Sequence, residues 1–349
     1  MKCNIIFSAA LAALTQIPLP TQAQPQQSVS GTNVSFHGDI LANRDISAVS
    51  MLGDLLVIGA DEAVGNKANE NYIQLLKPDD SGNYHVVSNI LVYRGDKQAG
   101  RELDIEGFAV QGRNLYVIGS HSLARKRPRK NNTYEENRVR MSKIKHEKSR
   151  YQLYRLKLDG SYQVGRREQI NLSSIFNNDP VLSRFTSIPS KENGIDIEGI
   201  AVKDGNLYLG FRGPVLRDGY VPVMRLKFNN PAESYRLFFL DIEGRGIRDM
   251  AAVSDGFLIL AGPVGNELVS YQLLHWNGKD CITGENLPEK GKLQLLTEIT
   301  PPDGGKAEGL ALISETAKTY ELIMVFDGAK NGAPRHYTIK RPRLESAHN

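Results

Sequence analysis

One sequence unit recurs five times along the 349 residues, and this repeat limits the fold more than any other feature. The two clearest copies begin with Asp104-Ile105-Glu106-Gly107 and Asp196-Ile197-Glu198-Gly199, and a second apolar run follows each after a short turn. Weaker copies begin at Asp45, Ile247 and Ala307. Self-similarity of this kind is typical of architectures in which each copy is one supersecondary unit.

Each copy predicts a β-hairpin, because two runs of β-branched or aromatic residues flank a turn that contains Gly or Asp. Further runs complete four strands in the first four copies, but the fifth copy lacks its fourth run, and residues 34–41 offer an unassigned strand. We therefore expect an all-β fold, a β-propeller with five blades of four antiparallel strands, whose last blade is closed by the N-terminal strand. A sixth, degenerate blade around residues 160–190 is an alternative, and so is a β-sandwich, which would not explain the repeat.

The N-terminal sequence predicts that the protein is exported. Lys2 precedes an apolar run from Ile5 to Leu14, and the small-residue site Thr21-Gln22-Ala23 follows, which is the pattern of a signal peptide over residues 1–23. We expect cleavage near Ala23, a disordered linker over 24–33, and one propeller domain over 34–345 in the periplasm or secreted. No later segment is long and apolar enough to predict a membrane span, and we expect a monomer. Removal of the signal leaves Cys281 alone, so no internal disulfide is expected.

Charge is concentrated in one segment. Residues 125–150 carry eleven Lys and Arg against three Glu, although the whole chain has a formal net charge of only +4. This basic arm lies in an insertion over 122–150 and shows no apolar period, so we expect a flexible segment or a marginal helix. In an exported protein its expected partners are an anionic small molecule or an envelope polyanion rather than nucleic acid. A solvated insertion without a function is the alternative.

The repeat places the chemically distinctive residues on one face. The first strand of each hairpin begins where the second one ends, so both sets of residues lie at the same end of every blade, and the basic arm overhangs that end. Residues i and i+2 of an extended strand point to one side, so the Asp-x-Glu pairs should converge on Ca²⁺ or Mg²⁺. The candidate metal ligands are Asp104, Glu106, Asp196, Glu198, Asp249 and Glu308. Alternatively, these acids accept hydrogen bonds from the next blade, pair with arginines between blades, or remain solvated.

Three further residues on this face are candidate catalytic groups. His121 ends the second strand of one hairpin and could act as a general base, or it is an ordinary loop residue. Arg212 and Arg248 could hold a phosphate or a carboxylate, or they pair with the neighbouring acids.

Longer motifs resemble a known family. The runs Gly194 to Ala201, Leu209 to Arg217, Gly244 to Asp249, Leu260 to Pro263 and Glu308 to Ala311 look like the bacterial domain-of-unknown-function 3616 family, and the matches extend across residues 40–340. That family resembles propellers called phytase-like esterases in its Glu-Gly-Ile-Ala signatures. The resemblance implies a propeller and hints at metal-assisted ester hydrolysis, but it includes no counterpart of the basic arm.

Two functions are consistent with these features. The acidic channel mouth could bind a divalent cation and hydrolyse a phosphate or carboxylate ester, which would make the protein a metal-assisted esterase or phosphatase-like hydrolase. Alternatively, the protein is a non-catalytic binding module that recognises a polyanion or a partner protein.

Overall fold

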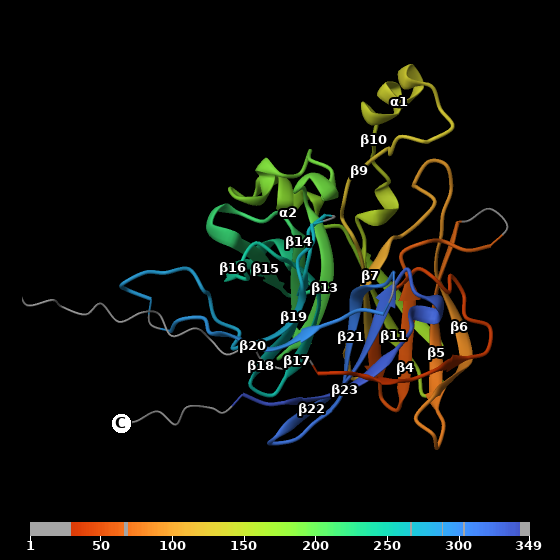
Figure 1. Cartoon of the computed structure of the whole chain (residues 1–349), viewed down its shortest axis with the longest axis vertical. Helices are drawn as coiled ribbons and strands as arrows, with labels where there is room; N and C mark the ends of the chain where they lie inside the picture. Colours follow the sequence, from red (N-terminus) through yellow and green to blue (C-terminus); the bar gives the residue numbers. More distant parts are fainter. Residues whose placement is uncertain (1–28, 66–68, 266, 288, 303, 343–349) are drawn as a thin grey trace, which may run out of the picture.

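The fold is the five-bladed propeller that the repeat predicts. A computed structural model describes residues 29–65, 69–265, 267–287, 289–302 and 304–342, and in it five antiparallel sheets stand around one axis (Figure 1). The predicted signal peptide over residues 1–23 lies outside the described residues.

Each blade contains four antiparallel strands, which are consecutive except in blade 2, where the basic arm intervenes, and in blade 5, whose outermost strand comes from the N-terminus. Blade 1 comprises β3 (Ile46–Leu52), β4 (Leu55–Ala60), β5 (Glu70–Pro78) and β6 (Tyr84–Arg94). Blade 2 comprises β7 (Ile105–Gln111), β8 (Asn114–Gly119), β11 (Leu153–Leu158) and β12 (Val164–Ile170). Blade 3 comprises β13 (Asp196–Lys203), β14 (Asn206–Gly213), β15 (Tyr220–Leu226) and β16 (Arg236–Asp241). Blade 4 comprises β17 (Gly246–Val253), β18 (Gly256–Gly262), β19 (Tyr271–Trp276) and β20 (Leu293–Ile299). Blade 5 comprises β21 (Lys306–Glu315), β22 (Thr319–Asp327), β23 (Arg335–Lys340) and β1 (Thr32–Asn33).

The first strand of every blade is the innermost one. Strands β3, β7, β13, β17 and β21 each contact the next in this order, and β21 contacts β3 again. The five blades therefore form a closed ring, and the start of each repeat faces the channel.

The N-terminal closure is confirmed, but with other residues than predicted. Strand β1 pairs antiparallel with β23, and the backbone N–H of Val34 donates to the carbonyl of Pro334. Strand β2 (Phe36–His37) instead pairs parallel with β6 of blade 1. The prediction of one strand over 34–41 in the last blade was thus wrong, and the strand that closes this blade is Thr32–Asn33, at the end of the predicted linker over 24–33. The reason is that β23 and β6 each expose an edge of unpaired backbone groups, which this segment satisfies in turn.

No sixth blade forms over residues 160–190. After β12 the chain forms α2 (Ser173–Asn178) and the 3₁₀ turns η2 (Leu182–Arg184) and η3 (Ser190–Glu192). Three short elements lie in other loops: η4 (Arg217–Gly219), α3 (Pro231–Ser234) and η5 (Lys330–Gly332).

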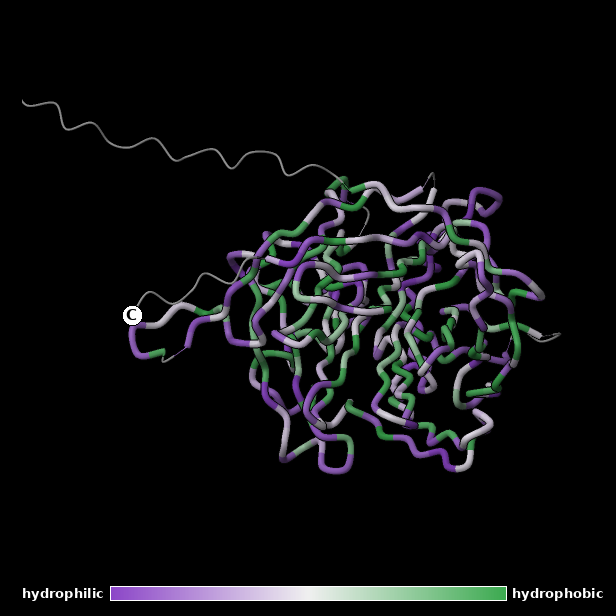
Figure 2. The backbone as a smooth tube through the Cα atoms, turned by 90° about the horizontal axis from the view of Figure 1, so that it is seen from below, coloured by the Kyte–Doolittle hydropathy of each residue, from purple (hydrophilic) through white to green (hydrophobic). Residues whose placement is uncertain are grey.

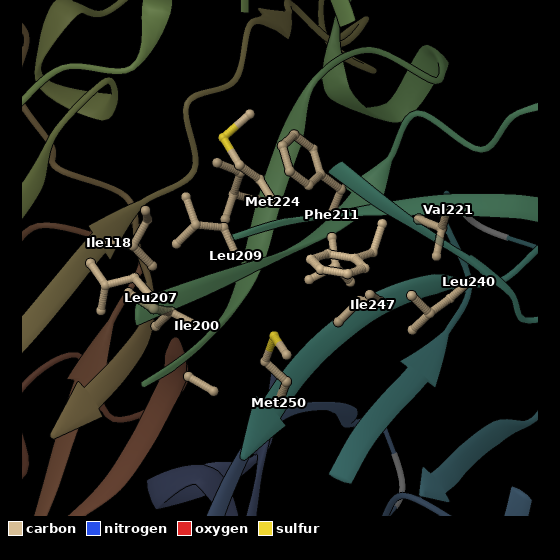
Figure 3. Close-up of a cluster of buried hydrophobic side chains, with 14 of the residues drawn as sticks. Ile118, Ile200, Leu207, Leu209, Phe211, Val221, Met224, Leu240, Ile247 and Met250 are labelled. Atoms are coloured by element: carbon tan, nitrogen blue, oxygen red, sulfur yellow. The ribbon is translucent and has the colours of Figure 1, made fainter. Parts of the chain in front are cut away.

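Apolar side chains fill the spaces between adjacent blades. The tube in Figure 2 shows apolar stretches through the interior strands and hydrophilic stretches in many peripheral loops. In Figure 3, Ile247 and Met250 of β17 lie beside residues of blade 3, including Ile200 and Phe211, in one buried cluster. A Cβ at Gly210 would lie 2.6 Å from the Ile247 side chain, so this glycine lets β14 and β17 approach closely.

The basic arm contains a short helix, in agreement with one of the two alternatives that its sequence left open. It contains β9 (Ala124–Arg125), α1 (Tyr134–Met141), β10 (Ile144–Lys145) and η1 (Lys148–Arg150), and it rises above one end of the ring in Figure 1. A capping box between Thr133 and Glu136 begins α1, and Arg140 Nε donates to the Arg127 carbonyl across 2.9 Å. Helix α1 buries no residue, in agreement with the missing apolar period. Among the described residues, no helix has the length and apolarity needed to cross a membrane.

Candidate functional site

A β-bulge occurs at the same position of the innermost strand in every blade. The strand register shifts around Ser47, Glu106, Glu198, Arg248 and Glu308. The extra residue of a bulge has no partner in the hydrogen-bond ladder, and its side chain points in a different direction from that in a regular strand. We call these five residues the bulge ring.

One arginine of the bulge ring binds both of its neighbours. Arg248 Nη1 lies 3.0 Å from Glu198 Oε2 of blade 3, and Nη2 pairs with Glu308 of blade 5. Arg248 is 2% exposed and Glu198 is 3% exposed, so these charges are removed from water. Burial of such a pair is favourable only when each charge has a close partner, and here the pairs connect three blades.

Two further arginines bind the remaining acids. Arg212 at the end of β14 pairs with both Asp196 and Glu198. Arg150 pairs with Glu102 and, across 2.8 Å, with Asp104. The carboxyl groups therefore outnumber the guanidinium groups that hold them.

Glu106 has no such partner. Among the described residues, no cation and no hydrogen-bond donor contacts its carboxyl group, although the equivalent Glu198 and Glu308 both bind Arg248. Burial and the surrounding acids, with Asp104 and Glu198 first among them, raise the pKa of Glu106 well above its usual value. Oxygen atoms of Glu106, Asp196 and Glu198 lie within 4.8 Å of one another, which is a spacing that could hold a metal ion.

Two residues of this group keep oxygens that could bind a hard cation. Arg212 takes one oxygen of Asp196, and Arg212 with Arg248 takes both oxygens of Glu198. This leaves Glu106 and Oδ1 of Asp196 uncommitted among the described residues. Burial also raises the pKa of Asp196 to about 7, so a cation bound at this point would compete with a proton.

These groups line a cavity of about 450 Å³ at the channel mouth. We call it the acidic cavity; the acids that line it are Asp61, Glu62, Asp104, Glu106, Glu192, Asp196, Glu198, Glu308 and Asp327. Asp45, Asp61 and Asp327 form a second group of acids with oxygens within 4.8 Å. Burial, reinforced by the charge of Asp104, raises the pKa of Asp61 well above its usual value. Asp327 is paired with Lys306 across 2.5 Å.

The opening of the acidic cavity carries positive charge. Arg125, Lys126 and Arg127 of the arm line it, together with Lys191 of η3. Burial, followed by the charges of Arg212, Arg127 and Lys306, lowers the pKa of Lys191. Arg125 pairs with Glu192 and donates from Nη1 to the Met141 carbonyl across 2.6 Å, so the arm is fixed beside the opening.

Asp249, a predicted metal ligand, has a different environment. Its Oδ2 accepts a hydrogen bond from the backbone N–H of Leu310 at 2.6 Å, and Oδ1 accepts from Met250 at 2.7 Å. The N–H of Ile200 also donates to this carboxyl group. Asp249 therefore connects blade 4 with both neighbouring blades, and it does not line the acidic cavity.

His121 also lies outside the acidic cavity. Its backbone has a left-handed φ of 54°, which turns the buried ring away from the channel and toward Tyr151 and Phe176. Burial lowers the pKa of His121 to about 4. The position equivalent to Arg212 is occupied in this repeat by Ser120, which is buried and donates to Asp104.

The cavity therefore unites Asp104, Glu106, Asp196, Glu198, Glu308 and Arg212 of the predicted site residues, with Arg248 directly behind them. Sequence reasoning missed Ser120, Arg150 and Lys191 as members of the site. Ser120 could have been found by aligning the repeats, since it corresponds to Arg212 and Asp327. Arg150 and Lys191 belong to insertions, which carry no repeat signal.

Similar structures share little sequence with this chain. A hypothetical protein from Leishmania major is 12% identical with a TM-score of 0.45 over 91% of each chain. An exo-β-1,3-galactanase from Phanerochaete chrysosporium, with β-1,3-galactotriose, is 8% identical with a TM-score of 0.44 over 89% of this chain and 64% of that one. The WD40 β-propeller domain of Doa1 is 10% identical with a TM-score of 0.32 over 86% of this chain and 68% of that one. No curated protein sequence matches the chain.

A family model, in contrast, matches most of the sequence. The match extends over residues 45–338, which include all five innermost strands and every residue of the bulge ring. It agrees with the family that the Glu-Gly-Ile-Ala and Arg-Gly-Pro motifs suggested. The chain belongs to the family described as "Protein of unknown function (DUF3616)".

Proposed function

We propose that the acidic cavity binds Ca²⁺ or Mg²⁺ through Glu106, Asp196 and Glu198 and hydrolyses a phosphate or carboxylate ester. One observation carries this proposal: Glu106 is the acid of the bulge ring that lacks a positive partner. Several buried carboxylates without matching cations favour either protonation or the binding of a hard cation with oxygen ligands.

The charges at the opening determine which substrates suit the cavity. Lys191 and Arg127 add positive charge above an acidic wall, an arrangement that attracts an anionic group toward the cation ligands. A bound Ca²⁺ or Mg²⁺ supplies Lewis acidity toward the ester oxygen and lowers the pKa of a coordinated water. Water adds to the phosphorus or carbonyl carbon, the bond to the leaving oxygen breaks, and an alcohol and an acid result.

The protein's own residues hold and orient the reacting groups. Arg212 holds Oδ2 of Asp196, and Arg212 and Arg248 together hold both oxygens of Glu198, which fixes the two carboxyl groups beside Glu106. Arg212 and Arg248 are positioning residues in this proposal, because each is engaged with carboxylates in the structure.

Hydrolysis of chromogenic esters tests the proposal. We expect the wild type to hydrolyse p-nitrophenyl phosphate or p-nitrophenyl acetate with added Ca²⁺ or Mg²⁺, and to lose this activity with excess EDTA. Glu106→Gln should lose it as well, whereas Glu285→Gln, an exposed control, should not. Equal activity in the wild type and Glu106→Gln would contradict a role of this cavity.

A second candidate is a non-catalytic module that binds a polyanion through the basic arm. The observation that favours it is the exposure of Arg129, Lys130 and Arg138 on a segment that rises above the ring (Figure 1). Deletion of residues 125–150 would also remove Arg150 from Glu102 and Asp104, so charge reversal at exposed positions is the better test.

A further inference from the structure

A second cavity, of about 430 Å³, lies between the basic arm and the segment that contains α2. The arm contributes Ile144 and His146, and the α2 segment contributes Ser173, Phe176 and Asn177. We call it the aromatic cavity. It shares no lining residue with the acidic cavity: Ser122 lines the acidic cavity, and the adjacent His121 and Leu123 line the aromatic one.

Aromatic rings form its walls in edge-on contacts. The ring centroids of His121 and Tyr151 are 5.9 Å apart, those of His121 and Phe176 are 5.7 Å apart, and those of His146 and Tyr151 are 5.0 Å apart. Phe176 also contacts Phe211 of the core at 5.9 Å. Edge-on ring contacts of this kind are favourable and directional, so the walls are preorganised.

The imidazole ring of His121, which forms part of this wall, carries no charge at neutral pH. Its Nδ1 lies 2.8 Å from the carbonyl of Gly119, which can only accept, so Nδ1 holds the proton of a neutral ring. Burial lowers the pKa of His121 to about 4, in agreement with this tautomer.

Tyr151 supplies an unpaired polar group. The residue is only 9% exposed and lines the cavity, yet its hydroxyl has no hydrogen-bond partner among the described residues. The hydroxyl oxygen is not fully buried, so water or a ligand atom can reach it, whereas Nε2 of the adjacent His121 ring is a buried acceptor without a partner among the described residues. The missing partner can be a ligand atom.

We propose that the aromatic cavity binds a small planar aromatic molecule whose oxygen pairs with the hydroxyl of Tyr151. Planar rings suit a wall of edge-on aromatic side chains, and the volume is within the range of small-molecule sites. The hydroxyl of Tyr151 and Nε2 of His121, which lacks a partner in the described part of the chain, orient such a ligand, and Ser173, Asn177 and Thr186 add further polar atoms to the wall. This inference does not depend on the proposed hydrolysis, since the two cavities share no residue.

Titration with 2-naphthol, followed by fluorescence anisotropy of the probe, tests the inference. We expect saturable binding to the wild type, and about tenfold weaker binding to Tyr151→Phe, which keeps the ring and removes the hydroxyl. Tyr134→Phe is the matched control, because Tyr134 is exposed on α1, and it should bind like the wild type.

A cavity-filling change tests the location. Thr186→Trp places a large side chain at the wall without removing an aromatic ring, and it should abolish binding while circular dichroism stays that of the wild type. If that variant does not fold, Asn177→Trp serves the same purpose from an exposed position. Absence of saturable binding to the wild type, or unchanged binding to a folded cavity-filled variant, would overturn the inference.

Discussion

Nη1 of Arg248 in blade 4 lies 3.0 Å from Oε2 of Glu198 in blade 3, and the two residues occupy equivalent bulges of adjacent repeats. The same position in blade 2 is Glu106, which faces Glu198 and Asp196 without a positive partner. One repeated feature thus gives a structural acid in one blade and an unsatisfied acid in the next.

Removing the charge of Glu106 should stabilise the protein, whereas removing that of Glu198 should destabilise it. Without added cation at pH 8, Glu106→Gln relieves repulsion among buried acids and should raise the free energy of unfolding by about 1–2 kcal/mol. Glu198→Gln removes a charged partner from both Arg212 and Arg248, and it should lower the free energy of unfolding by about 3–5 kcal/mol. Urea unfolding measures both. A loss of stability in Glu106→Gln would mean that this carboxylate is structural after all.

The stability of the cation-free protein should fall as pH rises from about 5 to about 8. Burial raises the pKa of Glu102 to about 7 and raises that of Glu106 and Asp61, so the folded state retains protons that the unfolded chain releases near pH 4. Stability falls with pH wherever the folded state binds more protons. Melting temperatures in EDTA at pH 5, 6, 7 and 8 provide the measurement, and Glu106→Gln should show a shallower decline. An increase of stability over this range would refute the assignment of these raised pKa values.

Asp249→Asn should destabilise the ring. The side-chain amide can accept at only one end, so one of the backbone N–H groups of Leu310, Met250 and Ile200 loses its acceptor, which costs about 1–3 kcal/mol. Asp80→Asn, at an exposed position, is the control and should be neutral. Thermal unfolding in parallel with cation titration separates the roles: Asp249→Asn should melt earlier but bind cation normally, and lost cation binding at full stability would make Asp249 a ligand.

Charge reversal on the arm should weaken binding to anionic surfaces. The triple variant Arg129→Glu/Lys130→Glu/Arg138→Glu changes three exposed residues of the arm. Its matched control, Lys157→Glu/Lys227→Glu/Lys318→Glu, changes exposed lysines near the opposite end of the blades. Co-sedimentation with phosphatidylglycerol vesicles and heparin-column retention should decrease in the first variant only. Equal decreases would indicate a response to net charge rather than a function of the arm.

The repeat predicted the fold because each hairpin carries its own strand and turn signals, and because a closed ring places equivalent residues together. The spacing of the Asp-x-Glu motifs placed Asp104, Glu106, Asp196 and Glu198 on one face, and all four line the acidic cavity. The β-bulges could not be predicted from this spacing, since register depends on the partner strand as much as on the strand itself. The exact place of the N-terminal strand was missed for the same reason, because two blade edges compete for residues 32–37.

The roles of individual charged residues needed the structure. Asp249 and Glu106 look alike in sequence, yet one accepts backbone hydrogen bonds and the other has none. His121 follows Ser120, which binds Asp104, but the left-handed backbone of His121 places its ring in the wall of the aromatic cavity. Arg150 comes from the end of the arm, and its pairing with Asp104 depends on how an insertion folds back.

Isothermal titration calorimetry with Ca²⁺ and Mg²⁺ at pH 8 tests most directly whether Glu106 is a cation ligand. We expect the wild type to bind one of these ions, more tightly at pH 8 than at pH 6 because protons compete for the same carboxylates, and we expect Glu106→Gln to lose at least tenfold in affinity with its fold intact. No heat of binding in the wild type, or equal affinity in the wild type and a folded Glu106→Gln, would contradict the account.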